Sequence, residues 1–257
     1  MKNLAAILLS IIAIVINAQI SVAHFGMVIP AKPVVTGANR SIELSLSFAH
    51  PFETTGMDLE KPSHFYVLKD EIKTDLLPGL HEATIMDHQG WKTEFRVKRP
   101  GVYHFIMEPA PYWEPTEDLS IIHYTKVIVP AFGSEDGWEL PAGLPTEIVP
   151  LLRPFGNYAG NSFVGQVLVN GKASGGAEVE VEFYNQEQKL TAPSDYHITQ
   201  RVKADPNGVF SFTCPQPGWW GFAALSHADF KLRNPQGEEK GVELGAVLWI
   251  YMDTYQK

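Results

Sequence analysis

The chain has 257 residues, with 29 aspartates and glutamates against 20 lysines and arginines, and its formal net charge at pH 7 is −9. Because a nucleic-acid backbone attracts a basic surface, this charge argues against a nucleic-acid partner. The one cysteine, Cys214, excludes an intrachain disulfide, so the fold must be stabilised by burial of apolar side chains.

The chain begins with a pattern typical of a secretory signal peptide. Lys2 precedes an apolar run, residues 4–16, that is shorter than the ~20 apolar residues of a membrane-spanning helix. Small residues that suit a cleavage site follow at Ala18 and Ala23. We favour cleavage after Ala23, with residues 1–23 as the signal peptide. The protein would then be exported and would begin with His24.

Alternation of apolar and polar residues with a period of two predicts β-strands through the first half of the chain. The candidate strands are RSIELSLSF (40–48), WKTEFRV (91–97), VYHFIME (102–108) and IIHYTKVIV (121–129). No segment sustains the 3.6-residue period of a helix over a dozen residues. We therefore expect residues 24–132 to form an N-terminal β-sandwich.

A segment rich in proline and glycine, PAFGSEDGWELPAGLPTEIVP (130–150), predicts a linker over residues 133–145. Beyond it, short strand patterns restart, separated by tight-turn signals such as Asn170 and Gly171. With VLVNGKASGGAEVEVEFYN and VKADPNGVFSFTCPQPGWWGFAAL, this half resembles the prealbumin-like sandwiches of carboxypeptidase regulatory domains. The expected fold is all-β, with two β-sandwich domains, the second over residues 146–257.

Seven of the nine histidines lie before residue 130, so the first half is the candidate for a metal site. As the first residue, His24 would be a chelator, because its α-amine and its imidazole Nδ1 can bind one ion together. These groups have ordinary pKa values of about 8 and 6.5, so both lose their protons near neutral pH when a metal competes for them. Cleavage after Ala23 would thus create a bidentate ligand that no internal histidine can imitate.

Two further histidines are candidates for the same site. His50 precedes a proline, where the chain must leave its strand, so we expect it at a sheet rim, with Glu53 as the hydrogen-bond acceptor for its other ring nitrogen. His123 lies within a strand, where a buried histidine without a metal is the common alternative. We predict that His24, His50 and His123 converge on one ion, and His104 replaces His123 if that residue is silent. Imidazole and amine nitrogens suit nickel, cobalt, copper or zinc.

Five segments carry a resemblance to a known family: AHFGMVIP, AHPFETTGMDLEKPSHFYVL, IIHYTKVIVPAFG, PTEIVPLLRP and VELGAVLWIYM. In their order and their residues, these segments resemble the family of periplasmic components of ABC-type cobalt and nickel transport, over roughly the whole chain beyond the signal peptide. His24, His50 and His123 match histidines of that family. The resemblance implies a soluble periplasmic accessory protein that captures or delivers nickel or cobalt beside a membrane transporter.

Two other classes of function stay open at this point. The sequence holds neither a GxSxG nucleophile turn nor a phosphate-binding glycine loop, and we expect no enzyme. An N-terminal histidine with a second histidine is, however, also the ligand set of copper monooxygenases, whose single sandwich usually contains a disulfide. The other alternative is a carbohydrate- or protein-binding adhesion module, which would function fully in metal-free buffer.

Overall fold

The computed structural model describes residues 24–37 and 40–255, and within them the regular structure is almost entirely β. The predicted signal peptide lies outside the described residues. Two short 3-10 turns, η1 (Leu77–Gly79) and η2 (Asp195–His197), interrupt the strands. Across the described ranges, we find no helix with the length and apolar character needed to cross a bilayer.

The first sheet contains five strands, all from the first half of the chain, and its pairs are antiparallel. Its order is β1-β2-β7-β6, with β3 also paired to β2. The strands are β1 (Phe25–Pro30), β2 (Ser41–His50), β3 (Thr55–Met57), β6 (His81–Ile85) and β7 (His88–Arg96). In β2 the predicted alternation holds, since Ile42, Leu44 and Leu46 are buried and Glu43 is exposed.

The central sheet contains eleven strands and takes them from both halves of the chain. Its main path is β16-β15-β18-β20-β10-β8-β4-β5, and β9, β12 and β19 pair with β10 or β20 at its margins. The strands are β4 (His64–Lys69), β5 (Ile72–Asp75), β8 (Gly101–Glu108), β9 (Tyr112–Glu114), β10 (Leu119–Ala131), β12 (Asn157–Tyr158), β15 (Glu178–Phe183), β16 (Gln200–Lys203), β18 (Gly218–His227), β19 (Leu232–Arg233) and β20 (Glu239–Asp253).

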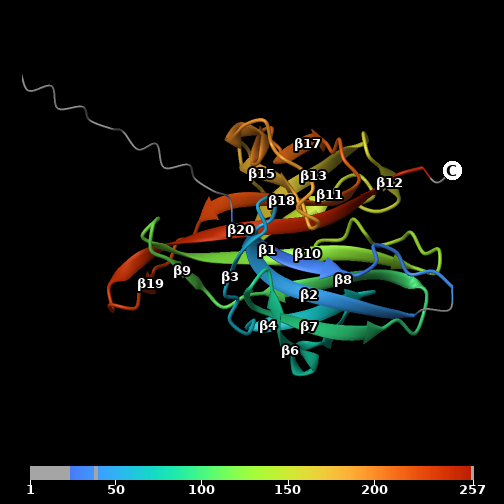
Figure 1. The fold of residues 1–257 in the computed structure, drawn as a ribbon, viewed down its shortest axis with the longest axis horizontal. Helices are drawn as coiled ribbons and strands as arrows, with labels where there is room; N and C mark the ends of the chain where they lie inside the picture. The colour runs from blue at the N-terminus through green and yellow to red at the C-terminus, as the bar shows by residue number, and fades with distance from the viewer. Residues whose placement is uncertain (1–23, 38–39, 256–257) are drawn as a thin grey trace, which may run out of the picture.

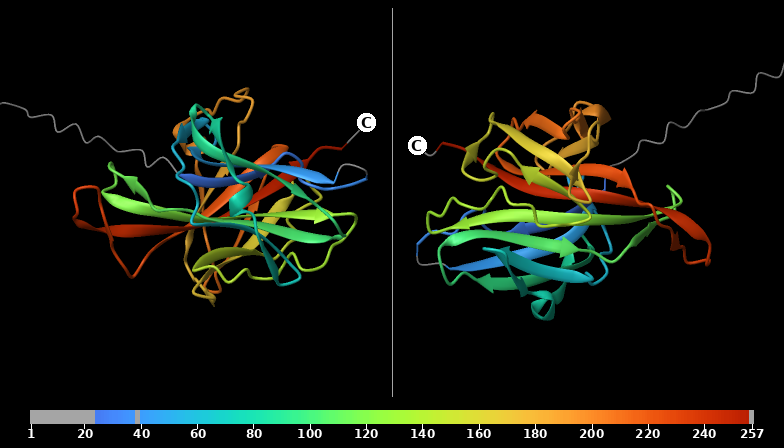
Figure 2. Two further views of the ribbon diagram at one scale, coloured as in Figure 1. Left: turned by 90° about the horizontal axis from the view of Figure 1, so that it is seen from below. Right: turned by 180° about the vertical axis from the view of Figure 1, so that it is seen from behind.

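The third sheet is small and comes from the second half of the chain. It contains β11 (Thr146–Pro150), β13 (Ser162–Val169), β14 (Lys172–Ala173) and β17 (Val209–Thr213), with β13 at its centre. The first and third sheets lie on opposite sides of the long strands β10 and β20 (Figure 1), and the turned views of Figure 2 show the same layering.

Each outer sheet buries a hydrophobic core against the central one. Along β20, successive side chains alternate between these cores, so Val247 and Trp249 enter the first core while Leu248 and Ile250 enter the second. A strand buried on both faces reads as a continuous apolar run, which explains the sequence GAVLWIYM. The C-terminal strand therefore supplies side chains to both sandwiches.

The predicted fold class is confirmed: the chain is all-β and builds two β-sandwiches. The structure adds that the two sandwiches share the central sheet, because β20 pairs in parallel with β10 across the predicted domain boundary. Parallel pairing of strands so distant in sequence leaves no local signal, so the sequence pattern could not anticipate it.

The segment predicted as a linker, 133–145, lacks strands and is packed against the central sheet. Glu147 accepts hydrogen bonds from the backbone N–H groups of Ala142 and Gly143, each at 2.9 Å, and from buried Lys126, also at 2.9 Å. Leu144 is buried with Tyr66 and Ile106 in a small cluster of its own. These contacts fix the crossing between the two halves of the chain.

Candidate metal site

His24 and His50 lie side by side at one end of the first sheet, where β1 begins and β2 ends. Phe25 pairs with Ala49, so the antiparallel register places the residue before β1 opposite the last residue of β2. The two imidazole rings have centroids 4.6 Å apart, and the His24 ring also stacks on Phe48 at 5.6 Å. The sequence prediction placed His50 at a sheet rim, and the register explains why His24 joins it there.

His123 reaches the same place from β10 of the central sheet. The His123 ring makes an edge contact with the Phe48 ring, on which His24 also stacks, and the His123 and Phe48 centroids are 5.7 Å apart. It lies opposite Gly245 of β20, where a Cβ atom would come within 2.2 Å of the imidazole Cδ2. The missing side chain at Gly245 therefore makes the space in which the buried His123 ring lies.

Two carboxylates contact the histidine rings, each on the Nε2 side. Glu114 of β9 lies 3.1 Å from Nε2 of His24, and Glu243 of β20 lies 3.4 Å from Nε2 of His123. Burial alone would raise the pKa of each carboxyl. Hydrogen bonds outweigh the effect of burial: Thr116 and His24 donate to Glu114, and His123 donates to Glu243. The pKa values of both carboxyl groups therefore lie below their ordinary range. Both groups are therefore carboxylates near neutral pH.

The surroundings of His24 keep its imidazole neutral. Burial lowers its pKa most, the charges of His50 and His123 lower it further, and those of Glu114 and Glu243 oppose the shift, which leaves a pKa of about 4. A neutral imidazole has a lone pair to give to a metal, and a carboxylate on its other nitrogen is the usual partner of a metal-bound histidine. Since Glu114 is on the Nε2 side, Nδ1 is the ring nitrogen left for a metal.

Nδ1 of His123 has no hydrogen-bond partner among the described residues, although the side chain is fully buried. A buried polar atom without a partner is costly and calls for an explanation such as an ion. Nevertheless, within residues 24–37 and 40–255 no three His, Cys, Asp or Glu side chains are arranged to hold a metal ion together. The histidines are neighbours, and side chains alone do not complete a ligand set.

His104 does not belong to this cluster, so the prediction that it could replace His123 is wrong. It pairs with Ile128 across β8 and β10, which puts it on the opposite face of the central sheet. There its Nε2 lies 3.0 Å from the carbonyl oxygen of Gly137, and burial followed by the charge of Lys126 lowers its pKa to about 4.

Glu114 and Glu243 are the site residues that sequence reasoning missed. Glu114 lies in a three-residue strand with no periodic pattern, and Glu243 reaches the site only through the parallel pairing of β20 with β10. The one usable signal was Gly245, because a glycine inside an apolar strand marks close approach of another group. Glu53, predicted to accept from His50, is exposed.

The turn that follows His50 is held by the second half of the chain. Glu182 of β15 is fully buried, and burial raises its pKa to about 8. The contacts across this boundary are Phe52 N–H to Glu182 Oε2 at 3.3 Å, Asn185 N–H to the Pro51 carbonyl at 3.3 Å and Gln188 Nε2 to Thr54 Oγ1 at 2.7 Å. The position of His50 thus depends on both halves.

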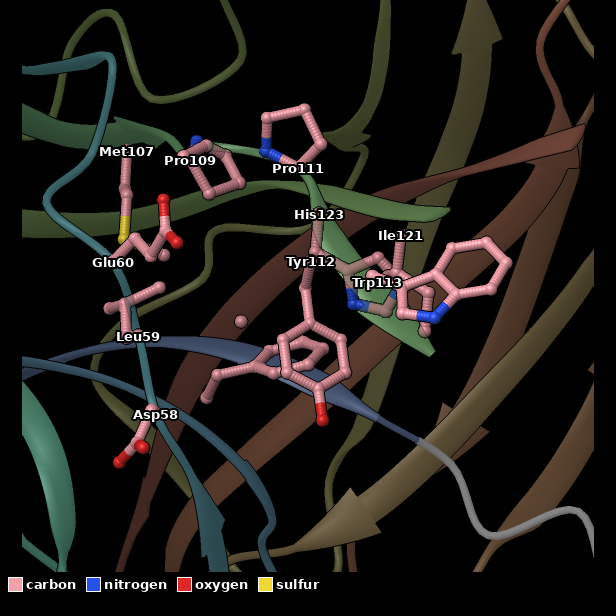
Figure 3. A pocket seen from close by; sticks show the side chains of 13 residues that line it. Asp58, Leu59, Glu60, Met107, Pro109, Pro111, Tyr112, Trp113, Ile121 and His123 are labelled. Carbon is pink, nitrogen blue, oxygen red and sulfur yellow. The ribbon is translucent and has the colours of Figure 1, made fainter. Parts of the chain in front are cut away.

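A cavity of about 240 Å³ opens beside His123 (Figure 3). Most of its lining is apolar or aromatic, including Phe48, Leu59, Met107 and Ile121. In Figure 3, residues 58–60 lie across the cavity from Tyr112 and Trp113, and His123 lies beyond Tyr112.

A family profile described as "Domain of unknown function (DUF4198)" matches residues 21–228 of this chain, which is most of its length. The chain belongs to the DUF4198 family. The match includes the three clustered histidines and Glu114 and ends before β20, so it leaves out Glu243 and Gly245. The family description names no function.

A comparison with curated proteins found no match. Solved structures with some similarity include dimeric latent PorU from Porphyromonas gingivalis (9% identity, 90% of this chain and 20% of that chain, TM-score 0.24). Others are a two-domain fibronectin type-III segment from chicken tenascin (10%, 86% and 97%, 0.21) and BcpA, the major pilin subunit of Bacillus cereus (10%, 90% and 66%, 0.21). The chain spans one fifth of the PorU chain, and likenesses this distant say nothing about the site.

Proposed function

We propose that this protein is an exported accessory protein that binds one nickel or cobalt ion and passes it to a membrane transporter. In this proposal, cleavage after Ala23 frees the α-amine of His24, and the amine and Nδ1 of His24 chelate the ion. His50 and His123 supply further nitrogens. The periplasmic location and the transporter follow from the family resemblance of the sequence.

One observation carries the proposal: within the part of the chain that the structure describes, the buried Nδ1 of His123 has no hydrogen-bond partner, while Glu114 and Glu243 lie on the Nε2 sides of His24 and His123. The Nδ1 atom of a first-position histidine is the one that can close a chelate ring with the α-amine. Because no three His, Cys, Asp or Glu side chains of the described residues are arranged to hold an ion together, the proposal adds the α-amine of the processed chain as a further nitrogen ligand.

The charges around the histidines fit a divalent cation. Glu114 and Glu243 are ionised, so together they balance two positive charges. In the proposed site they accept hydrogen bonds from the histidine ligands and do not bind the ion themselves. A nitrogen-rich set suits nickel, cobalt or copper, whereas calcium and magnesium prefer oxygen ligands. The α-amine of His24, with an ordinary pKa of about 8, must lose its proton to bind the ion, so the affinity should fall as the pH is lowered.

The test is calorimetric titration of the exported chain, after its first residue has been verified by intact mass. We expect one nickel or cobalt ion per chain, and a loss of at least tenfold in affinity for His24→Ala, His50→Ala and His123→Ala. The matched control is His64→Ala, which removes an exposed histidine whose Nδ1 lies 3.6 Å from Glu108 and should leave binding unchanged.

A second control isolates the amine. An alanine inserted between Ala23 and His24 keeps all side chains but moves the free amine one residue away, so it should weaken binding as strongly as His24→Ala. Binding that persists unchanged in this variant, or in both His50→Ala and His123→Ala, would refute the shared site. Copper bound far more tightly than nickel, with oxidation of an added polysaccharide, would favour the copper-enzyme alternative.

A further inference from the structure

The cavity beside His123 is continuous with the histidine cluster, because Phe48 and His123 belong to both. We propose that it binds a small organic chelator together with the metal, so that the cargo is a metal chelate rather than a hydrated ion. The inference rests on the proposed function and specifies its substrate class: an amino-acid-sized molecule with nitrogen and carboxylate donors and an apolar or aromatic body.

The lining of the cavity argues against a hydrated ion as its occupant. The water shell of a dication needs hydrogen-bond acceptors on every side, whereas Leu59, Met107, Pro109, Pro111 and Ile121 offer mostly carbon. An organic shell around the ion presents carbon to these side chains and removes apolar surface from water. The aromatic rings of Tyr112 and Trp113 on one side suit a flat ligand such as an imidazole.

The volume fits a molecule of this size. Pockets for drug-sized ligands measure ~300–1,000 Å³, and this cavity, at about 240 Å³, lies just below that range. A nickel ion held by the four protein nitrogens of the proposed site could also accept donor atoms from a small organic ligand. His123, whose buried Nδ1 has no hydrogen-bond partner among the described residues, is one of the residues that line the cavity.

The charge of the cavity wall selects among chelates. Asp58 and Glu60 line it and are exposed, and Asp58 is held in place by the N–H of Gln89 at 2.9 Å and by His88 at 3.2 Å. Two carboxylates repel an anionic complex and attract a cationic one. A nickel complex with one histidine is cationic, whereas a complex with citrate is anionic, so the two probes separate the cases.

The experiment loads the exported, processed chain with nickel alone, with nickel and one equivalent of isotopically labelled histidine, or with nickel and labelled citrate. After gel filtration we expect about one labelled histidine per nickel ion and no citrate. Ala110→Trp, which fills the cavity from its half-buried wall without changing a histidine, should keep nickel but lose the labelled histidine. Ala173→Trp, exposed on β14, is the matched control and should retain both.

The outcomes separate this inference from the function on which it rests. Nickel bound without labelled histidine, or histidine retained in full by Ala110→Trp, would overturn the chelate while leaving the metal site intact. Failure of every sample to bind nickel, with or without histidine, would overturn the proposed function itself. Retention of citrate at the level of histidine would show that the cavity does not select by charge and would also overturn the inference.

Discussion

Replacing Gly245 by alanine is expected to destabilise the protein and to weaken metal binding together. The new methyl group would lie 2.2 Å from Cδ2 and 2.6 Å from Nε2 of His123, far inside the ~3.5–4.0 Å of favourable carbon contacts. His123 is only 2% exposed, so its ring cannot swing out into solvent. The imidazole must tilt, and its contact with Glu243 must lengthen or break.

Overpacking of this kind costs ~1–3 kcal/mol. In a chain of this size each kcal/mol lowers the melting temperature by roughly 2–4 °C, so the expected decrease is about 2–12 °C. Gly241→Ala is the matched control, because it lies in the same strand and its new methyl group would meet no atom within 4 Å. It should melt at the same temperature or slightly higher, since glycine inside a strand is itself destabilising.

Thermal unfolding followed by circular dichroism measures the first effect, and nickel calorimetry the second. In a His123→Ala background the imidazole is gone, so Gly245→Ala should lose most of its cost, and the double-mutant cycle should show the coupling. Equal melting temperatures for Gly245→Ala and Gly241→Ala, or an equal cost of Gly245→Ala with and without the imidazole, would refute the steric argument.

Three further predictions concern buried ionisable groups. Burial raises the pKa of Glu182 from 4.5 to about 8, so the folded protein loses stability as the pH rises from 4.5 to 8. Urea unfolding should show that Glu182→Gln loses less unfolding free energy over this pH range than the parent protein. The pKa of His104 is lowered from 6.5 to about 4, so its contribution to the free energy of unfolding disappears as the pH falls from 6.5 to 4. An unfolding free energy that falls with pH equally steeply in His104→Gln over this range would contradict this prediction. Lys126→Met strands Glu147 without its buried partner and should cost ~3–5 kcal/mol of unfolding free energy in denaturant titrations. The control is Lys92→Met, which removes the exposed partner of Glu43 and should lower the unfolding free energy by only ~0–1 kcal/mol.

Local sequence patterns predicted what depends on neighbours along the chain. The alternation in β2 specified a half-buried strand, and the proline after His50 placed that histidine at a rim. His24 was chosen as a candidate ligand because cleavage is predicted after Ala23, although its contact with His50 depends on strand register. These predictions require only periodicity, turn residues and the chemistry of an N-terminal histidine.

Long-range pairing set the rest of the site, and no pattern within a segment encodes it. Glu243 and His123 are 120 residues apart and meet because two strands run parallel. His104 and His123 both lie in strands of similar composition, and only the register of β8 against β10 shows that they face opposite ways. The sharing of one sheet by both sandwiches escaped prediction for the same reason.

The central position of β20 also decides when the molecule can fold. Chains are synthesised from the N-terminus, so β20, which carries Glu243, becomes available only after β10 and β18, the strands with which it pairs. Until then β10 and β18 present unpaired edges, which invite association with other chains. A chain without β20 would leave both cores open and would lack Glu243 and Gly245. Slow folding through non-local strand pairing is the kinetic consequence.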